Sequence, residues 1–108
     1  MALTKREQEY KQLLENLLED LKSQGITVKF VSDRVLKDYA AMNYEAAKDF
    51  GYDKKNEINA KEYHVSSSMS YERQYKDLKH EIYEQGYMKN GDTYWDAHCK
   101  SLAEEAKL

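Results

Sequence analysis

Residues 71–85 read YERQYKDLKHEIYEQ, and this stretch predicts an amphipathic helix. The apolar residues of this stretch recur at helical spacing and fall on one stripe of a helical wheel. They are Tyr71, Tyr75, Leu78 and Ile82. We expect this stripe to face the core, with Ser70 as the N-cap of the helix and Gly86 as its stop.

The opposite side of the predicted helix carries residue types that bind metals. Its members are Arg73, Asp77, His80 and Glu84. His80 and Glu84 are four residues apart, so both can bind one metal ion, as the two histidines of an HExxH helix do. Glu81 follows the first ligand directly, where such a site needs a general base that activates water. Asp77, one turn before His80, is placed to accept the second imidazole proton.

A third ligand is expected from the next helix, because a catalytic zinc ion usually has three protein ligands and one open position. That helix carries His98 on or beside its inward face. The short turn at Asn90-Gly91 favours antiparallel packing of the two helices, which would bring His98 toward the polar face described above. His64, on a predicted strand before residue 71, is a lesser candidate.

The same residues also have purely structural explanations. Charged side chains opposite an apolar stripe are typical of any solvated helix face, and the bare pattern HExxE has a high rate of false positives. His98 can be a half-buried histidine with satisfied hydrogen bonds. Cys99 is expected to be a small core residue, because the sequence shows no partner that would activate its thiol. From the residues alone, both explanations stay open.

The whole chain predicts one α+β domain over residues 1–108, mostly helical, with about four helices and one or two short strands. The helices are expected over about 4–24, 33–50, 71–85 and 93 to near the end of the sequence, after caps at Thr4, Ser32 or Asp33, Ser70, and Asp92 or Thr93. The strands are expected at 26–31 and 62–66, and residues 52–60 are expected to form a loop.

Composition indicates a soluble, cytoplasmic protein. No apolar run approaches the roughly 18 residues that span a bilayer, and the N-terminal residues lack the apolar segment of a signal peptide. The single cysteine cannot form an internal disulfide, which fits a reducing compartment. A net charge of -3 argues against nonspecific binding of nucleic acid. Recognition through the second predicted helix is also disfavoured, because Asp33 and Asp38 lie among its few basic residues.

The HExxE helix, the glycine that follows it, and the segment Tyr94-Trp95-Asp96-Ala97-His98 resemble small proteins of phages and other mobile elements. Those proteins look like minimal relatives of the zincin metallopeptidases, which include the repressor-cleaving ImmA/IrrE-type enzymes. The resemblance covers about residues 57–106. It implies a zincin-like active helix with His80 and Glu84 as zinc ligands, Glu81 as the base, and His98 as a third ligand or a site-shaping residue.

Two further expectations follow from the resemblance. In zincins a strand before the active helix aligns a peptide substrate along its edge, and Tyr63-His64-Val65 stands at that place in this sequence. Zincins have a second histidine where this chain has Glu84, so either an active or a degenerate domain fits the pattern. Glutamate is itself an accepted zinc ligand.

Two functions are therefore expected from the sequence. The first is a zinc-dependent, peptidase-like hydrolase of a phage or mobile element, acting on a peptide or protein partner. The alternative is a non-enzymatic interaction, accessory or inhibitor protein, for which Leu13, Leu17 and Leu21 on the first helix would offer a pairing face. The sequence predicts no oligomeric state.

Overall fold

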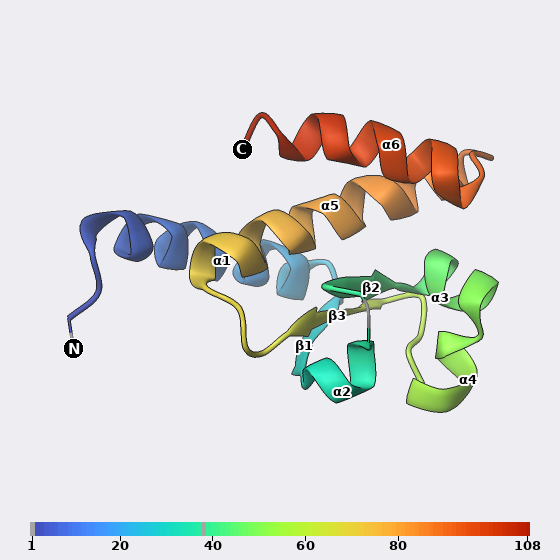
Figure 1. The fold of residues 1–108 in the computed structure, drawn as a ribbon, viewed down its shortest axis with the longest axis horizontal. Coiled ribbons are helices and arrows are strands. Elements are labelled where there is room, and N and C mark those ends of the chain that lie inside the picture. The colour runs from blue at the N-terminus through green and yellow to red at the C-terminus, as the bar shows by residue number, and fades with distance from the viewer. Residues whose placement is uncertain (1, 38) are drawn as a thin grey trace.

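The computed structural model describes residues 2–37 and 39–108, and within them it contains six helices and a three-stranded sheet (Figure 1). The elements in chain order are α1 (Lys5–Ser23), β1 (Thr27–Val31), α2 (Asp33–Leu36), β2 (Ala41–Asn43), α3 (Tyr44–Phe50), α4 (Tyr52–Asn56), β3 (Glu62–Ser66), α5 (Tyr71–Lys89) and α6 (Tyr94–Glu105). The predicted α+β class and the predominance of helices are confirmed. The expected number of about four helices is too low.

The sheet has the strand order β1-β3-β2, so the strand that leads into α5 lies in its centre. β1 runs parallel to β3, with Thr27 opposite Glu62 and Val31 opposite Ser66. β2 runs antiparallel to β3, with Ala41 opposite Val65. All five residues of β3 are buried, because helices cover both faces of the central strand.

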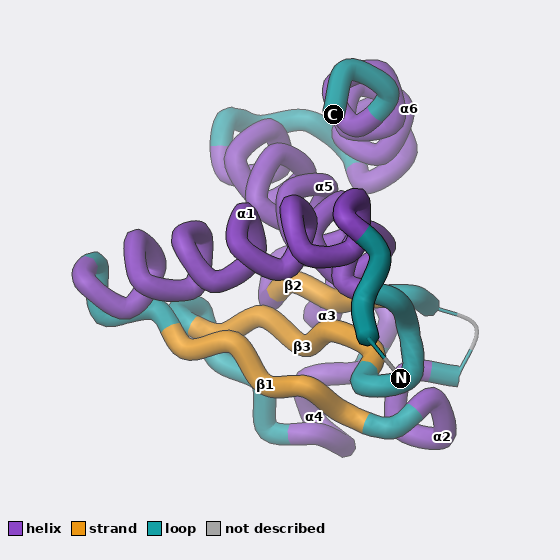
Figure 2. Tube along the Cα trace, turned by 90° about the vertical axis from the view of Figure 1, so that its left-hand side faces the viewer, coloured by secondary structure: helices purple, strands orange, loops and turns teal. Residues whose placement is uncertain are grey.

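The helices form layers on the two faces of the sheet. α1 and α5 cover one face, and α6 lies on the outer side of α5 (Figures 1 and 2). The core between these helices and the sheet contains Leu14, Leu21, Ala41, Tyr63, Val65 and Leu78. The short helices α2, α3 and α4 surround a second cluster, formed by Leu36, Met42, Ala46, Ala47, Tyr52 and Ile58. Within the described residues, no helix has both the length and the apolar character that a membrane crossing needs.

Three of the predicted helix starts are confirmed. The side chains of Thr4, Ser70 and Thr93 accept hydrogen bonds from backbone N–H groups three residues on, at 3.1–3.3 Å. Each of these bonds satisfies a donor that the first turn of a helix leaves free. The strands at 27–31 and 62–66 and the turn at Asn90-Gly91 are also found where they were expected.

The single helix predicted over 33–50 is wrong. The structure has α2, β2 and α3 in this range, and Asp38 lies outside the described residues. Leu36, Met42 and Ala46 recur at helical spacing, but they reach the same core cluster from three different elements. Asn43 ends β2 and caps α3 by accepting a hydrogen bond from the N–H of Ala46. Periodicity cannot separate these two arrangements, because a short apolar run fits a helix or a strand.

Three smaller expectations are also wrong. Residues 52–56 form the short helix α4 rather than a loop. Gly86 does not stop the third predicted helix, which continues to Lys89, because the chain turns only at Gly91, whose φ is +106°. Cys99 is exposed on α6 rather than part of the core.

Candidate metal centre

The polar side of α5 is buried rather than solvated from Asp77 onward, whereas Arg73 near its start is exposed. Asp77, His80, Glu81 and Glu84 are at most 7% exposed. α6 packs antiparallel along α5 after the turn at Gly91, and its fully buried residues at this contact are the small Ala97 and Ser101. Small side chains at a helix contact allow a close approach of the two helices. Four ionisable groups of one helix face are therefore enclosed between α5, α6 and β2.

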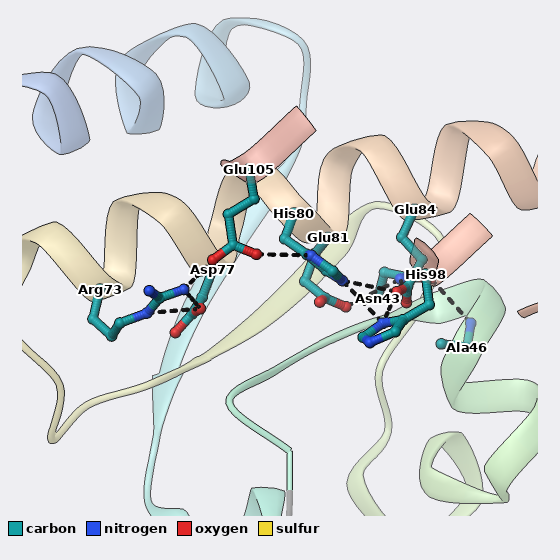
Figure 3. A network of polar contacts seen from close by, with 9 residues as sticks. All are labelled: Asn43, Ala46, Arg73, Asp77, His80, Glu81, Glu84, His98 and Glu105. Atoms are coloured by element: carbon teal, nitrogen blue, oxygen red, sulfur yellow. Dashed lines mark hydrogen bonds and ion pairs between the residues drawn. The ribbon is translucent and has the colours of Figure 1, made fainter. Parts of the chain in front are cut away.

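Three of the predicted ligands converge in this enclosed space (Figure 3). Oε2 of Glu84 lies 3.0 Å from Nε2 of His80 and 3.0 Å from Nδ1 of His98. The two imidazole nitrogens are 3.2 Å apart. The i,i+4 spacing on α5 supplies the first pair, and the antiparallel hairpin of α5 and α6 supplies His98.

The triangle of donor atoms has the size that a small metal ion requires. Ligand atoms at 2.0–2.1 Å from a tetrahedral zinc ion are separated by about 3.3 Å. As a set of ordinary hydrogen bonds the triangle is cramped, because two N–H groups would approach one oxygen of Glu84 from directions only about 65° apart. A cation at the centre would instead take one lone pair from each of the three atoms.

The second imidazole nitrogen of His80 is held by Glu105. Nδ1 of His80 lies 3.1 Å from Oε2 of this glutamate on α6. The expectation that Asp77 would make this contact is wrong, because Oδ1 of Asp77 accepts two hydrogen bonds from Arg73. Arg73 also pairs with the other carboxylate oxygen of Glu105. A carboxylate on the second nitrogen fixes the tautomer and ring orientation of a metal-binding histidine.

Asn43 is a site residue that the sequence analysis missed. Its side-chain amide donates to Oε1 of Glu81 at 3.1 Å and to Oε1 of Glu84 at 3.0 Å. Its carbonyl oxygen caps α3 through the N–H of Ala46. Asn43 is fully buried, and its two bonds to Glu81 and Glu84 fix the two carboxylates relative to β2. An asparagine directly before a helical segment is a cap signal, but nothing in the sequence connects it with residues 81 and 84.

The charges at the site are poorly compensated by the protein itself. Burial and the neighbouring charge of Glu84 raise the pKa of Glu81 to about 8. Burial lowers the pKa of His80, but the hydrogen bond to Glu84 and the nearby carboxylates outweigh it, so the net shift is upward. Burial and the charges of Glu84 and Glu81 also raise the pKa of Tyr94. Each of these pKa shifts favours the protonated, more positive form of its group. A bound cation would supply the same positive charge next to the buried carboxylates.

A cavity of about 290 Å³ opens onto these groups. Its walls include Ala41 and Met42 of β2, and His80, Glu81, Glu84 and His98 all line it. The cavity gives a ligand of several atoms access to the donor triangle.

His64 does not take part in this cluster. It projects from β3 toward α4, where Oη of Tyr52 lies 2.8 Å from its Nδ1 atom. Burial lowers its pKa, as expected for a neutral core histidine. The structure therefore leaves His98 as the histidine that joins His80 and Glu84.

Comparisons of the chain with protein-family models, with curated proteins and with solved structures gave no match. The function is therefore inferred from the geometry of the side chains.

Proposed function

We propose that this protein is a zinc-dependent, zincin-like hydrolase that acts on a peptide or protein. The convergence of His80, Glu84 and His98 at 3.0–3.2 Å carries this proposal. Two imidazole nitrogens and one carboxylate oxygen form a donor set that catalytic zinc sites use. As the resemblance of the sequence implies, the host would be a phage or another mobile element.

A zinc ion bound there would polarise the substrate carbonyl and make water more acidic. The three ligand side chains come from the rigid pair α5 and α6, so their positions are set before any ligand arrives. Glu105 and Asn43 hold His80 and Glu84 in the orientation that points their free donor atoms at one another. The open side of the triangle faces the cavity.

Glu81 is the proposed general base. It follows His80 on α5, it lines the cavity, and within the described part of the chain it is bonded through Oε1 to Asn43, which leaves Oε2 without a bond to another side chain. This oxygen would take the proton of water and deliver it to the departing amine. Burial and the charge of Glu84 raise the pKa of Glu81 in the metal-free protein, and a bound cation would lower it again and favour the carboxylate that acts as a base.

An edge strand of the sheet, β2, borders the cavity. The N–H of Ser66 on β3 donates to the carbonyl of Ala40, so in the alternating antiparallel pattern the backbone groups of Ala41 point away from β3. Ala41 also lines the cavity. We propose that a substrate pairs with this strand. The edge strand is β2, whereas the sequence analysis expected Tyr63-His64-Val65, which lie in the central strand.

An assay of peptide-bond hydrolysis tests the proposal. It uses untagged protein that is produced in medium with added zinc. A casein digest followed by mass spectrometry should show new peptide ends with the wild-type protein and none with Glu81→Gln, which keeps all three ligands. If both proteins bind one zinc ion and neither cleaves any peptide bond, the hydrolase function is wrong and only the metal site stands.

A non-enzymatic binding protein is the second candidate. The predicted pairing face of Leu13, Leu17 and Leu21 on α1 gives it little support, because Leu21 is buried in the core and Leu17 packs against that core, which leaves Leu13 as its exposed member at 43%. Exposed apolar residues at the cavity favour it instead, as they would hold a partner without cleaving it. A partner peptide that binds the wild-type protein and dissociates from it uncleaved would support this alternative.

A further inference from the structure

Exposed apolar side chains gather at the mouth of the cavity. Within residues 2–37 and 39–108, seven large hydrophobic residues are exposed. Four of them, Tyr39, Phe50, Trp95 and Leu102, line the cavity or contact His98. Scattered exposed apolar residues need no explanation, but a group of them around one polar cavity marks a binding surface.

The three aromatic members of this group and the half-buried Tyr94 form a continuous rim, which comprises Tyr39, Phe50, Tyr94 and Trp95. Tyr39 stacks on Phe50 with ring centres 5.4 Å apart, and Phe50 meets the edge of Tyr94 at 4.8 Å. Tyr94 stacks on His98 at 5.4 Å. The rim therefore leads from solvent to one of the proposed zinc ligands without a polar break. Aromatic surfaces of this kind contribute much of the contact energy in binding sites.

The floor of the cavity is acidic. Its lining carries the carboxyl groups of Asp77, Glu81, Glu84 and Glu105, against the guanidinium of Arg73 and the imidazoles of His80 and His98. A buried carboxylate cluster repels an acidic ligand and attracts a cationic one.

We propose that the cavity selects a basic and apolar peptide segment. An aromatic or large aliphatic side chain would lie against the rim, and a neighbouring lysine or arginine would lie near the acidic floor. This selectivity rests on the proposed function for its catalytic consequence, but the binding itself needs no cleavage.

Binding to short peptides tests this selectivity. The protein is the metal-free wild-type chain, which keeps all four carboxyl groups of the cavity, and the probes are acetylated, amidated hexapeptides with a central Lys-Phe or Phe-Lys pair among alanines. Calorimetry should show binding that falls roughly tenfold or more when phenylalanine is replaced by alanine, and again when lysine is replaced by glutamate. Equal affinity for all of these peptides would overturn the proposal.

The protein offers a matched control for the rim. Phe50 and Phe30 are 42% and 40% exposed, but Phe30 lies on β1, away from the cavity. Phe50→Ser and Leu102→Ser should each weaken the Lys-Phe peptide severalfold, while Phe30→Ser should leave its affinity unchanged. Equal losses from Phe50→Ser and Phe30→Ser in folded proteins would contradict a role for the rim.

The two proposals fail in different ways. Titration with zinc alone, without peptide, reports on the metal site. If zinc does not bind and the basic, apolar peptides still bind selectively, the hydrolase is wrong and the selectivity stands. If zinc binds and the peptides do not discriminate, the selectivity is wrong and the metal site stands.

Discussion

Nε2 of His80 lies 3.2 Å from Nδ1 of His98, although the two residues are 18 positions apart and on different helices. Both nitrogens also lie 3.0 Å from the same oxygen of Glu84. Three atoms that each present a lone pair repel one another unless a proton or a metal ion lies between them. The position of α6 on α5 therefore matters for the proposed metal site, because it closes this triangle.

Zinc should stabilise the folded protein. A ligand that binds only the folded state adds about 2.7 kcal/mol at a free concentration one hundred times its Kd. We expect a higher melting temperature with zinc and a lower one after chelation. His98→Ala should lose this zinc-dependent shift, because only two donor atoms remain. A shift of equal size in both proteins would indicate that zinc binds elsewhere.

Asn43→Asp should weaken zinc binding by about 10–100-fold, as loss of outer hydrogen bonds to metal ligands typically does. An aspartate still caps α3 by accepting from the N–H of Ala46, but it cannot donate to Glu81 and Glu84. Competition with a chromophoric chelator measures the affinity. Asn43→Ala, which removes the cap as well, serves as the comparison for stability. Unchanged zinc affinity in folded Asn43→Asp would show that these bonds are structural only.

Glu105→Gln should also lower the zinc affinity, because the amide binds Nδ1 of His80 more weakly than the carboxylate does. Glu104→Gln is the matched control, since the ion pair that Glu104 makes among the described residues is with Lys107 on the surface. The same chelator competition applies. Equal affinities of the two variants would argue against a role of Glu105 in orienting His80.

Glu72 should make stability depend on pH. Hydrogen bonds from Arg6 and Lys76 lower the pKa of this carboxyl from 4.5 to about 2. Because the folded pKa is depressed, the stabilisation is complete above pH 4.5 and is lost as the pH falls toward about 2. Urea unfolding should find Glu72→Gln less stable than wild type at pH 7, with the difference closing near pH 2. Since the groups are exposed, the difference should be small and should shrink in high salt. A constant difference across this range would contradict the assignment.

The sequence was informative where neighbours along the chain determine the structure. The spacing of His80 and Glu84, the caps at Thr4 and Ser70, and the turn at Asn90-Gly91 are local features, and the structure places all of them as expected. Even the approach of His98 follows from a short connection between two helices.

Contacts between distant segments were not predictable from one sequence. Asn43 reaches Glu81 and Glu84 across about forty residues, because β2 pairs with β3 and lies against α5. Glu105 reaches His80 only because α6 keeps its register along α5 for three turns. The apolar spacing over residues 33–50 fits a helix equally well. The strand β2 forms through its pairing with the distant strand β3, which the spacing does not show.

X-ray absorption at the zinc edge, on untagged protein loaded with one equivalent of zinc, tests the metal site most directly. We predict two imidazole nitrogens and at least one oxygen, all at about 2.0–2.2 Å. A sulfur at about 2.3 Å, which only Cys99 or a methionine could supply, or a zinc ion surrounded by water oxygens alone, would contradict the assignment of His80, Glu84 and His98.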